Sequence, residues 1–345
     1  MLLRAGWVVP VDRPPLRDAA VAVEDGRVRW VGAASEAPAG DVRDLGPGVL
    51  LPGLVNAHCH LELSHLAGRL GEARGFVDWV ERLVTTRPQD PPEVVRRRAS
   101  AGIQELEDTG TAGVGDVSNA LAHLDLLARS SLRARVFFEL IGWDPETAAR
   151  VIEGAHSRLA GVEPAERVMV SLAAHAPHSV SAPLLRAMAD SGGVSALHLA
   201  ESPHERRFLH GRDPEWSAFL ARRGLGHVPF VPPHLSPVRY LDRLGVLHPG
   251  LVAAHAVQVD EGDCAVLAAR GVAVVLCPRS NQALDVGLAP VPELRAAGVR
   301  LSMGTDSLAS VPSLDLWEDV LRMRVGMGFR NHRALRCLDR SGVDD

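Results

Sequence analysis

The sequence predicts an α/β protein whose main domain is a (β/α)8 barrel of the TIM type. Three observations support this. Eight short apolar runs follow one another between Leu54 and Asp306, and helical stretches such as PPEVVRRRASAGIQELEDTG and APVPELRAAG separate them. Such alternation is typical of parallel strands joined by crossover helices, and eight units suit a closed barrel better than an open sheet. The alternative, an open doubly wound sheet, would favour a Gly-x-Gly-x-x-Gly motif after the first run, and the sequence has no such motif there.

The first 50 residues have a different pattern, of short strands divided by turns. GWVVPV precedes DAAVAVEDGRVRWVG, in which Glu24, Asp25 and Gly26 predict a hairpin-type turn between two alternating runs. Two Pro-Gly pairs, at 47–48 and 52–53, then mark the change to the barrel pattern.

Polar residues stand at the ends of several barrel runs. The runs, in chain order, are LVNAHCH, TAGVGDVS, RARVFFEL, VMVSLAAH, VSALHLAE, LVAAHAV, VAVVLCP and VRLSMGTD. The ionisable residues at their ends are His58 and His60 in the first run, His175 in the fourth, His198 and Glu201 in the fifth, His255 in the sixth and Asp306 in the eighth. Because the carboxyl ends of barrel strands meet on one face, these residues predict a single functional site.

The first of these runs carries a metal-binding spacing. His58 and His60 are two positions apart, so in an extended strand both side chains point to the same face. Together with His198 and Asp306 they offer three imidazole nitrogens and one carboxylate. This set suits zinc or ferrous iron and leaves a position for a water, whose pKa a bound metal lowers from about 15.7 towards about 7.

Composition excludes several other functions. Lysine and arginine total 37 against 42 acidic residues, giving a net charge of -5. This balance does not favour a nucleic acid partner. All the basic residues are arginine, because the chain contains no lysine. The absence of lysine excludes a Schiff-base or pyridoxal enzyme, a Walker-type phosphate loop and a carboxylated-lysine site.

Cysteine content and hydropathy give the cellular setting. The four cysteines are far apart and form no Cys-x-x-Cys pair, so neither a disulfide framework nor a thiolate zinc site is indicated. No run approaches the ~18 apolar residues of a membrane span, and the N-terminal apolar run is too short for a signal peptide. We therefore expect a cytoplasmic protein with a small-molecule substrate and no membrane partner.

The motifs PGLVNAHCH, HLAE, the His-Ala pair of the sixth run and GTDS resemble the amidohydrolase superfamily, from Trp7 to about Val320. Within it, VNAHCHLELS, AAHAPHSVS, LCPRSN and GTDSLAS are most similar to metal-dependent nucleoside deaminases. The most similar subgroup is the aminodeoxyfutalosine deaminases of the alternative menaquinone pathway. The adenosylhomocysteine and methylthioadenosine deaminases follow.

The resemblance implies roles for individual residues. His58, His60, His198 and Asp306 match the metal ligands, Glu201 the proton-shuttling acid, His255 the residue that orients or polarises the attacked site beside the metal, and His175 a substrate contact. Superfamily members with two metals use a bridging carboxylated lysine or a glutamate near the fourth strand. This chain has neither there, so we expect one divalent metal per chain, zinc or else ferrous iron.

Three further residues are candidate substrate contacts. Glu62 lies just past the His-Cys-His motif and would hydrogen-bond substrate hydroxyls, with capping or a salt bridge as the alternative. Ser280 and Asn281 follow the seventh run and either line the pocket or close a turn.

The resemblance also divides the chain into three parts. Residues 1–53 would form the N-terminal part of a small β-sandwich, residues 54–330 the metal-dependent hydrolase barrel, and residues 331–345 an atypical, truncated C-terminus. Relatives usually continue past this point and complete the sandwich, so the N-terminal strands would have unpaired edges. Two explanations are considered for this short end. Either the gene is truncated, or a partner subunit, such as the second copy in a homodimer, covers the exposed strands.

The leading function is therefore hydrolytic deamination of an aminated purine-type nucleoside, in particular aminodeoxyfutalosine. One alternative is hydrolysis of another C–N or C–Cl bond, as in an adenosylhomocysteine-type deaminase or a chlorohydrolase. The other is an inactive, truncated homologue that only binds.

Overall fold

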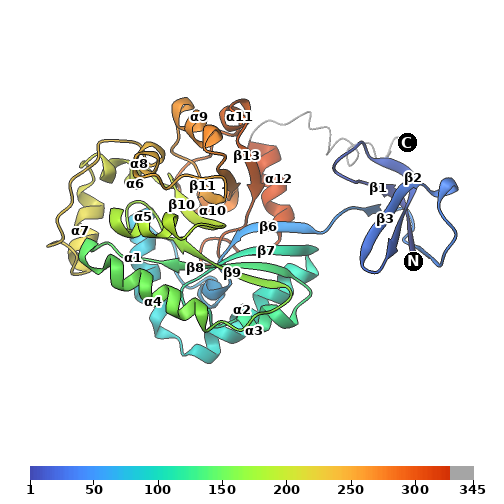
Figure 1. Cartoon of the computed structure of the whole chain (residues 1–345), viewed down its shortest axis with the longest axis horizontal. Coiled ribbons are helices and arrows are strands. Elements are labelled where there is room, and N and C mark those ends of the chain that lie inside the picture. Colours follow the sequence, from blue (N-terminus) through green and yellow to red (C-terminus); the bar gives the residue numbers. More distant parts are fainter. Residues whose placement is uncertain (327–345) are drawn as a thin grey trace. The chain divides into compact units, whose positions relative to one another are not determined.

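The structure is a computed structural model in which residues 1–326 are described. The chain divides into two compact units, of which one contains Met1–Gly53 and the other Leu54–Met323 (Figure 1). The segment 331–345, for which an atypical and truncated C-terminus is expected, lies outside the described residues.

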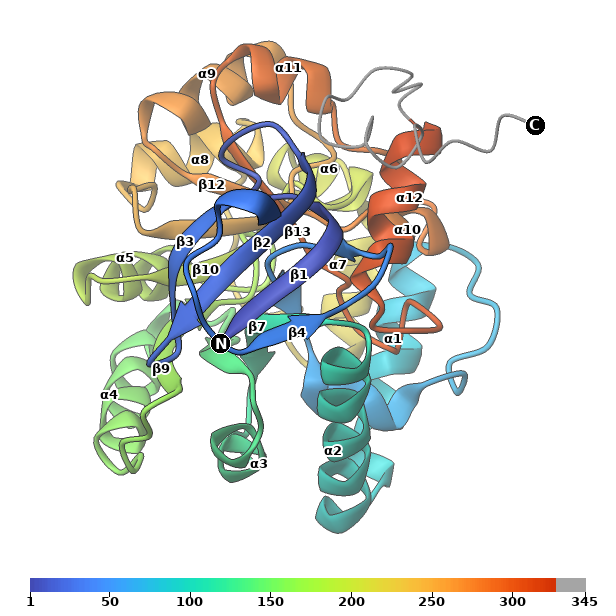
Figure 2. The same ribbon diagram turned by 90° about the vertical axis from the view of Figure 1, so that its right-hand side faces the viewer.

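The N-terminal unit is a five-stranded sheet with the order β3-β2-β1-β4, in which β5 also pairs with β1 (Figure 2). Its elements are β1 (Leu2–Val8), β2 (Leu16–Glu24), β3 (Arg27–Ala33), the 3-10 turn η1 (Ala34–Glu36), β4 (Val42–Asp44) and β5 (Val49–Leu50). Strands β2 and β3 are antiparallel and join at Asp25 and Gly26, whose φ angles are 50° and 69°. Two consecutive positive φ angles are typical of a tight hairpin turn, as the sequence predicts.

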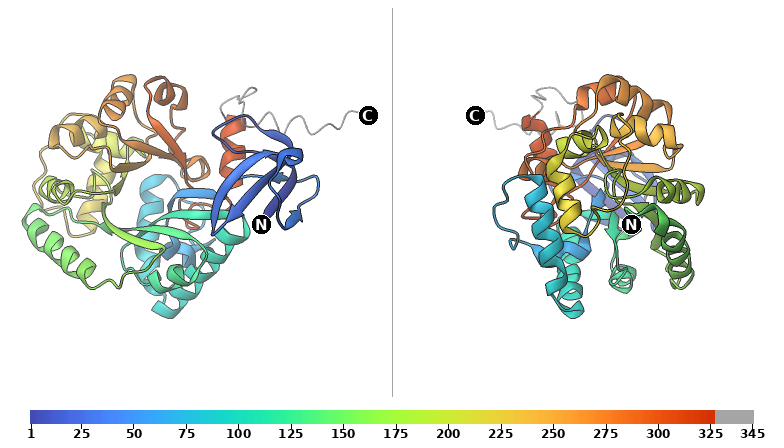
Figure 3. Two further views of the ribbon diagram at one scale, coloured as in Figure 1. Left: turned by 45° about the vertical axis from the view of Figure 1, so that its right-hand side comes forward. Right: turned by 90° about the vertical axis from the view of Figure 1, so that its left-hand side faces the viewer.

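The second unit contains a parallel sheet of eight strands with the order β13-β12-β11-β10-β9-β8-β7-β6. Each predicted run forms one strand: β6 (Leu54–Cys59), β7 (Thr111–Ser118), β8 (Arg133–Leu140), β9 (Val168–Ala174), β10 (Ser195–Leu199), β11 (Leu251–His255), β12 (Ala273–Leu276) and β13 (Arg300–Met303). Figure 3 shows helices surrounding these strands. The sheet is a nearly closed barrel, so the predicted (β/α)8 fold is confirmed.

The helices connect successive strands along the outside and at the ends of the barrel. They are α1 (Phe76–Thr86), α2 (Pro92–Asp108), α3 (Leu124–Arg129), α4 (Ala148–Ala160), α5 (Ala182–Asp190), α6 (Pro203–Leu209), α7 (Pro214–Arg222), α8 (Pro237–Leu244), α9 (Glu261–Ala269), α10 (Pro278–Ala283), α11 (Val291–Ala296) and α12 (Leu316–Gly326), with 3-10 turns η2 (Leu61–Leu66), η3 (Arg87–Gln89) and η4 (Pro145–Thr147). Among the described residues, no helix is long and apolar enough to cross a membrane.

Polar side chains join the first and last barrel strands. The amide nitrogen Nδ2 of Asn56 donates to Thr305 Oγ1 at 2.8 Å, and the Thr305 backbone N–H donates to Asn56 Oδ1 at 3.1 Å. Gly304 is required here, since a Cβ at this position would lie 2.7 Å from the backbone oxygen of His58. The Asp306 backbone N–H then donates to the same oxygen at 3.0 Å. This closure brings the loop after β13 against the end of β6.

Candidate metal centre

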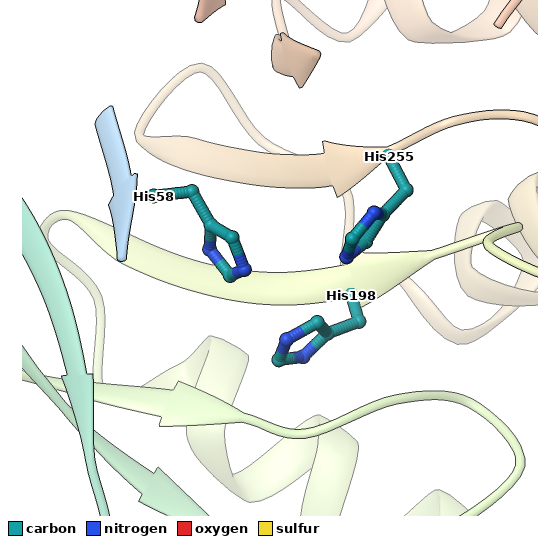
Figure 4. Close-up of side chains that lie close together, drawn as sticks. All are labelled: His58, His198 and His255. Atoms are coloured by element: carbon teal, nitrogen blue, oxygen red, sulfur yellow. The ribbon is translucent and has the colours of Figure 1, made fainter. Parts of the chain in front are cut away.

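The four predicted ligands converge at the carboxyl ends of the barrel strands. His60 Nε2 lies 3.2 Å from His58 Nε2 and 3.2 Å from His198 Nε2. The carboxylate oxygen Oδ1 of Asp306 lies 3.7 Å from His58 Nε2 and 3.5 Å from His60 Nε2. The structure thus gathers donor atoms from β6, β10 and the loop after β13. Figure 4 shows the rings of His58, His198 and His255, from three different strands, directed towards one another.

The backbone is strained where it leaves three of these strands. Ala200 after β10, His255 at the end of β11 and Asp306 after β13 have φ angles of 52°, 75° and 64°. A left-handed conformation costs a non-glycine residue about 1–2 kcal/mol, and such strain clusters at functional sites. At each of the three strand ends, the turn redirects the chain beside the converging side chains.

Hydrogen bonds determine which ring nitrogens face the centre. His198 Nδ1 donates to the backbone oxygen of His175 at 3.0 Å, so its Nε2 carries the lone pair. In the same way, His255 Nδ1 donates to Asn281 Oδ1 at 2.8 Å. The Nε2 atom of His255 is buried and has no hydrogen-bond partner. Unprotonated nitrogens therefore point into the cluster.

The charge states of these groups fit a cation. Burial lowers the pKa values of His58 and His255, and the neighbouring imidazoles lower that of His58 further, so both rings are neutral. Burial alone would raise the pKa of Asp306, but His60 and the hydroxyl of Ser280 hold it below its ordinary value.

A proton on His60 Nε2 could be shared with only one of the two nitrogens that lie 3.2 Å from it. A bound cation would instead accept a lone pair from the Nε2 atoms of His58, His60 and His198 at the same time. Neutral imidazoles with one carboxylate are a donor set typical of zinc. Among the described residues, the groups close enough to hold a metal ion all belong to this cluster and its immediate neighbours, Glu139, His175, Glu201 and His255.

Glu201 lies beside the ligands with its carboxyl group buried. Its Oε1 atom is 3.6 Å from His255 Nε2, and it is grouped with His255 and Asp306. Burial raises the pKa of Glu201 to about 8, and the negative charge of Asp306 acts in the same direction. A carboxyl group that titrates near neutral pH can both donate and accept a proton. The general acid and base role expected of Glu201 stays a prediction at this point.

His175 lies beside His198. Its Nδ1 atom is 2.6 Å from Ser179 Oγ, its ring centroid is 4.9 Å from that of His198, and burial lowers its pKa to about 4. A neutral, partly exposed imidazole at the rim of the cluster can hydrogen-bond a substrate.

The other predicted contacts have partners within the protein. The Glu62 carboxylate accepts hydrogen bonds from Ser118, the backbone of Asn119 and Ala120, and Arg87, so it ties η2 to the end of β7. Burial opposes ionisation of Glu62, but Arg87 and these donors lower its pKa. A substrate contact by Glu62 stays a prediction.

Ser280 and Asn281, at the start of α10, contact the cluster itself. Ser280 Oγ donates to Asp306 Oδ2 at 2.5 Å, and Asn281 accepts from His255 as described above. Both are almost completely buried. The geometry thus gives these two residues an orienting role towards Asp306 and His255, and their substrate contacts stay predictions.

Two further glutamates were not identified from the sequence. Glu139 is the penultimate residue of β8, and its Oε1 atom lies 3.5 Å from His198 Nδ1 without a hydrogen-bond partner. Glu205, in α6, is buried and accepts a hydrogen bond from the Glu201 backbone N–H. Glu139 could have been recognised from its position near the end of the run RARVFFEL, because the site histidines also stand near the ends of their own runs. The signal for Glu205 was the Ser-x-x-Glu spacing from Ser202.

Comparisons with known proteins show which family the chain resembles. The model of the Amidohydrolase family matches residues 49–339. An aminodeoxyfutalosine deaminase of Deinococcus radiodurans is 35% identical over 294 residues, which cover 79% of this chain and 67% of that protein. A 5-methylthioadenosine/S-adenosylhomocysteine deaminase of Nitratidesulfovibrio vulgaris strain DP4 is 30% identical over 338 residues, covering 92% and 71%. Among solved structures, an adenosine deaminase from Xanthomonas campestris with bound zinc has a TM-score of 0.76 and 25% identity, covering 98% of this chain and 74% of that one.

Proposed function

The chain belongs to the amidohydrolase family of hydrolases that act on carbon–nitrogen bonds, and from this premise we propose that it is a metal-dependent deaminase of purine-type nucleosides. The observation that carries the proposal is the position of Glu201. This buried carboxyl group lies 3.6 Å from His255 and beside Asp306, next to the four residues proposed as metal ligands. Deamination needs a proton donor such as this carboxyl group, since the leaving nitrogen must gain a proton.

We propose that His58, His60, His198 and Asp306 hold one divalent cation per chain. Zinc is favoured by the three imidazoles and one carboxylate, and by the zinc in the Xanthomonas protein, with ferrous iron as the alternative. Such a cation acts as a Lewis acid that makes water ionise near neutral pH.

The residues of the chain then move the protons. Glu201 takes a proton from the attacking water and delivers it to the ring nitrogen next to the amine-bearing carbon as the new C–O bond forms. The unprotonated Nε2 of His255 accepts a hydrogen bond from the same water and orients it. Glu201 next carries the second proton of the water to the amino group. The C–N bond breaks, ammonia leaves and a ring carbonyl remains, so one water is consumed for each ammonia released.

The substrate we propose is aminodeoxyfutalosine, because a relative named for that activity is 35% identical over most of this chain. Methylthioadenosine and adenosylhomocysteine form the second candidate class, since the relative named for them is 30% identical over 92% of the chain. His175, at the rim of the cluster, is the proposed substrate contact. The presence of all four proposed ligands together with Glu201 argues against a catalytically inactive homologue.

The test is ammonia release from a panel of aminated purine nucleosides by metal-replete protein. We expect turnover of aminodeoxyfutalosine above that of methylthioadenosine, adenosylhomocysteine and adenosine. Glu201→Gln keeps the size of the side chain and removes its titrating proton, so kcat should fall by about 10²–10⁴-fold with metal content unchanged. Glu261→Gln, an exposed position at the start of α9, is the matched control and should behave as the parent. A Glu201→Gln variant with near-parental turnover would exclude Glu201 as the proton carrier.

A further inference from the structure

Glu205 lies in the first turn of α6, four residues after Glu201. Ser202 is the N-cap of this helix, and its hydroxyl accepts a hydrogen bond from the Glu205 backbone N–H at 3.4 Å. In an ordinary capping box, the glutamate at this position would return its side chain to the backbone N–H of Ser202. The Glu205 side chain instead reaches further back along the chain.

The Glu205 carboxyl group binds the backbone of the two residues that follow β10, Ala200 and Glu201. Its Oε1 atom accepts from the Ala200 backbone N–H at 3.0 Å, and its Oε2 atom accepts from the Glu201 backbone N–H at 3.0 Å. One side chain thus binds two consecutive amides, each through a different oxygen. The segment it holds includes Ala200, whose φ angle of 52° is unfavourable for a residue with a Cβ.

The surroundings of Glu205 are closed. The residue is 1% exposed, and the unpartnered Nδ1 atom of His178 lies 3.9 Å from its Oε2 atom. The His178 ring packs edge-on against Trp216, with 4.5 Å between the ring centroids. Glu205 is therefore shielded from solvent, and it contacts the site through the backbone N–H groups of Ala200 and Glu201.

From this arrangement we infer that Glu205 is a positioning residue for the proposed proton carrier. It holds the backbone at Ala200 and Glu201 in the turn that directs the Glu201 carboxyl group towards His255 and Asp306. The catalytic part of this inference rests on the proposed function, whereas the hydrogen bonds that define it do not. The role accounts for a buried glutamate whose two oxygens both accept from neighbouring backbone amides.

A double-mutant cycle of Glu201→Gln and Glu205→Gln tests the inference in kinetics. Glutamine at 205 can accept from only one of the two amides and places its NH2 group against the other. We expect Glu205→Gln alone to lower kcat by about 10–10²-fold, with KM and metal content within about twofold of the parent. In the Glu201→Gln background, the same substitution should lower kcat by less than about twofold, because its effect passes through Glu201. Equal losses in both backgrounds would overturn the inference.

Amide hydrogen exchange tests the placement without any substrate. Peptides that span residues 199–203 should exchange at least about tenfold faster in Glu205→Gln than in the parent, and Glu261→Gln should match the parent. If Glu205→Gln does not fold, Glu205→Asp serves, because its shorter side chain cannot reach both amides. Unchanged exchange in the folded variant would overturn the inference. A parent that releases no ammonia would instead contradict the proposed function, and exchange would still report on Glu205.

Discussion

Replacement of Asn281 by leucine tests how the protein sets the state of His255. Asn281 Oδ1 accepts the proton of His255 Nδ1 at 2.8 Å, which leaves Nε2 unprotonated beside Glu201. Leucine is similar in size but offers no acceptor, so a buried N–H would lose its partner at a cost of about 1–3 kcal/mol. The ring can avoid this cost by moving its proton to Nε2. The active tautomer would then fall by about 5–150-fold, since about 1.4 kcal/mol is a factor of ten in population.

The assay is steady-state deamination together with metal analysis of the same protein. We expect Asn281→Leu to lower kcat by about 10–10²-fold while metal content stays at the parental level, because Asn281 touches His255 and not the four ligands. Gln282→Leu, on the exposed side of the same short helix, is the control and should leave kcat unchanged. Parental kcat in Asn281→Leu would refute the argument from tautomers. Loss of metal in step with activity would show that His255 is itself a ligand.

Three other predictions concern the metal and the stability of the barrel. Purified protein should contain about one equivalent of divalent metal by elemental analysis, falling strongly in His198→Ala, and two equivalents in active protein would contradict a single site. Arg279→Ala removes the partner of Asp319, whose side chain is 0% exposed, and should lower the free energy of unfolding by about 3 kcal/mol in urea titrations; a change below about 1 kcal/mol would contradict this. Burial opposes protonation of His123, but Asp116 at 2.7 Å raises its pKa above the ordinary value. The stability that this pair adds is therefore full below about pH 6.5 and declines at higher pH. The loss of unfolding free energy caused by His123→Gln should accordingly shrink between pH 6 and 9. A loss that stays constant over this range would contradict the raised pKa of His123.

The barrel was predictable because its signals are local and repeated. Each apolar run forms one strand, and the turn at Asp25 and Gly26 follows from residues that tolerate positive φ angles. The convergence of His58, His198 and Asp306 also follows from one rule, the common direction of parallel strands. Both features need only the chain order and the local pattern, which a sequence contains in full.

The partners of the site residues are different, because they depend on which side chains meet after folding. The sequence places Asn281 near the seventh run, but it does not show that its amide would face the ring of His255, 26 positions away. The same holds for Glu62, whose donors lie on another strand and a distant turn. Glu205 is a stronger case: its spacing from Ser202 is that of an ordinary capping box, yet its side chain binds the backbone of Ala200 and Glu201 instead. The left-handed turn at Ala200 brings those two amides within reach, and nothing in the composition of the segment predicts that turn, since alanine disfavours it. The proximity of the proposed ligands can therefore be predicted from the sequence, but the residues that set their geometry require the structure.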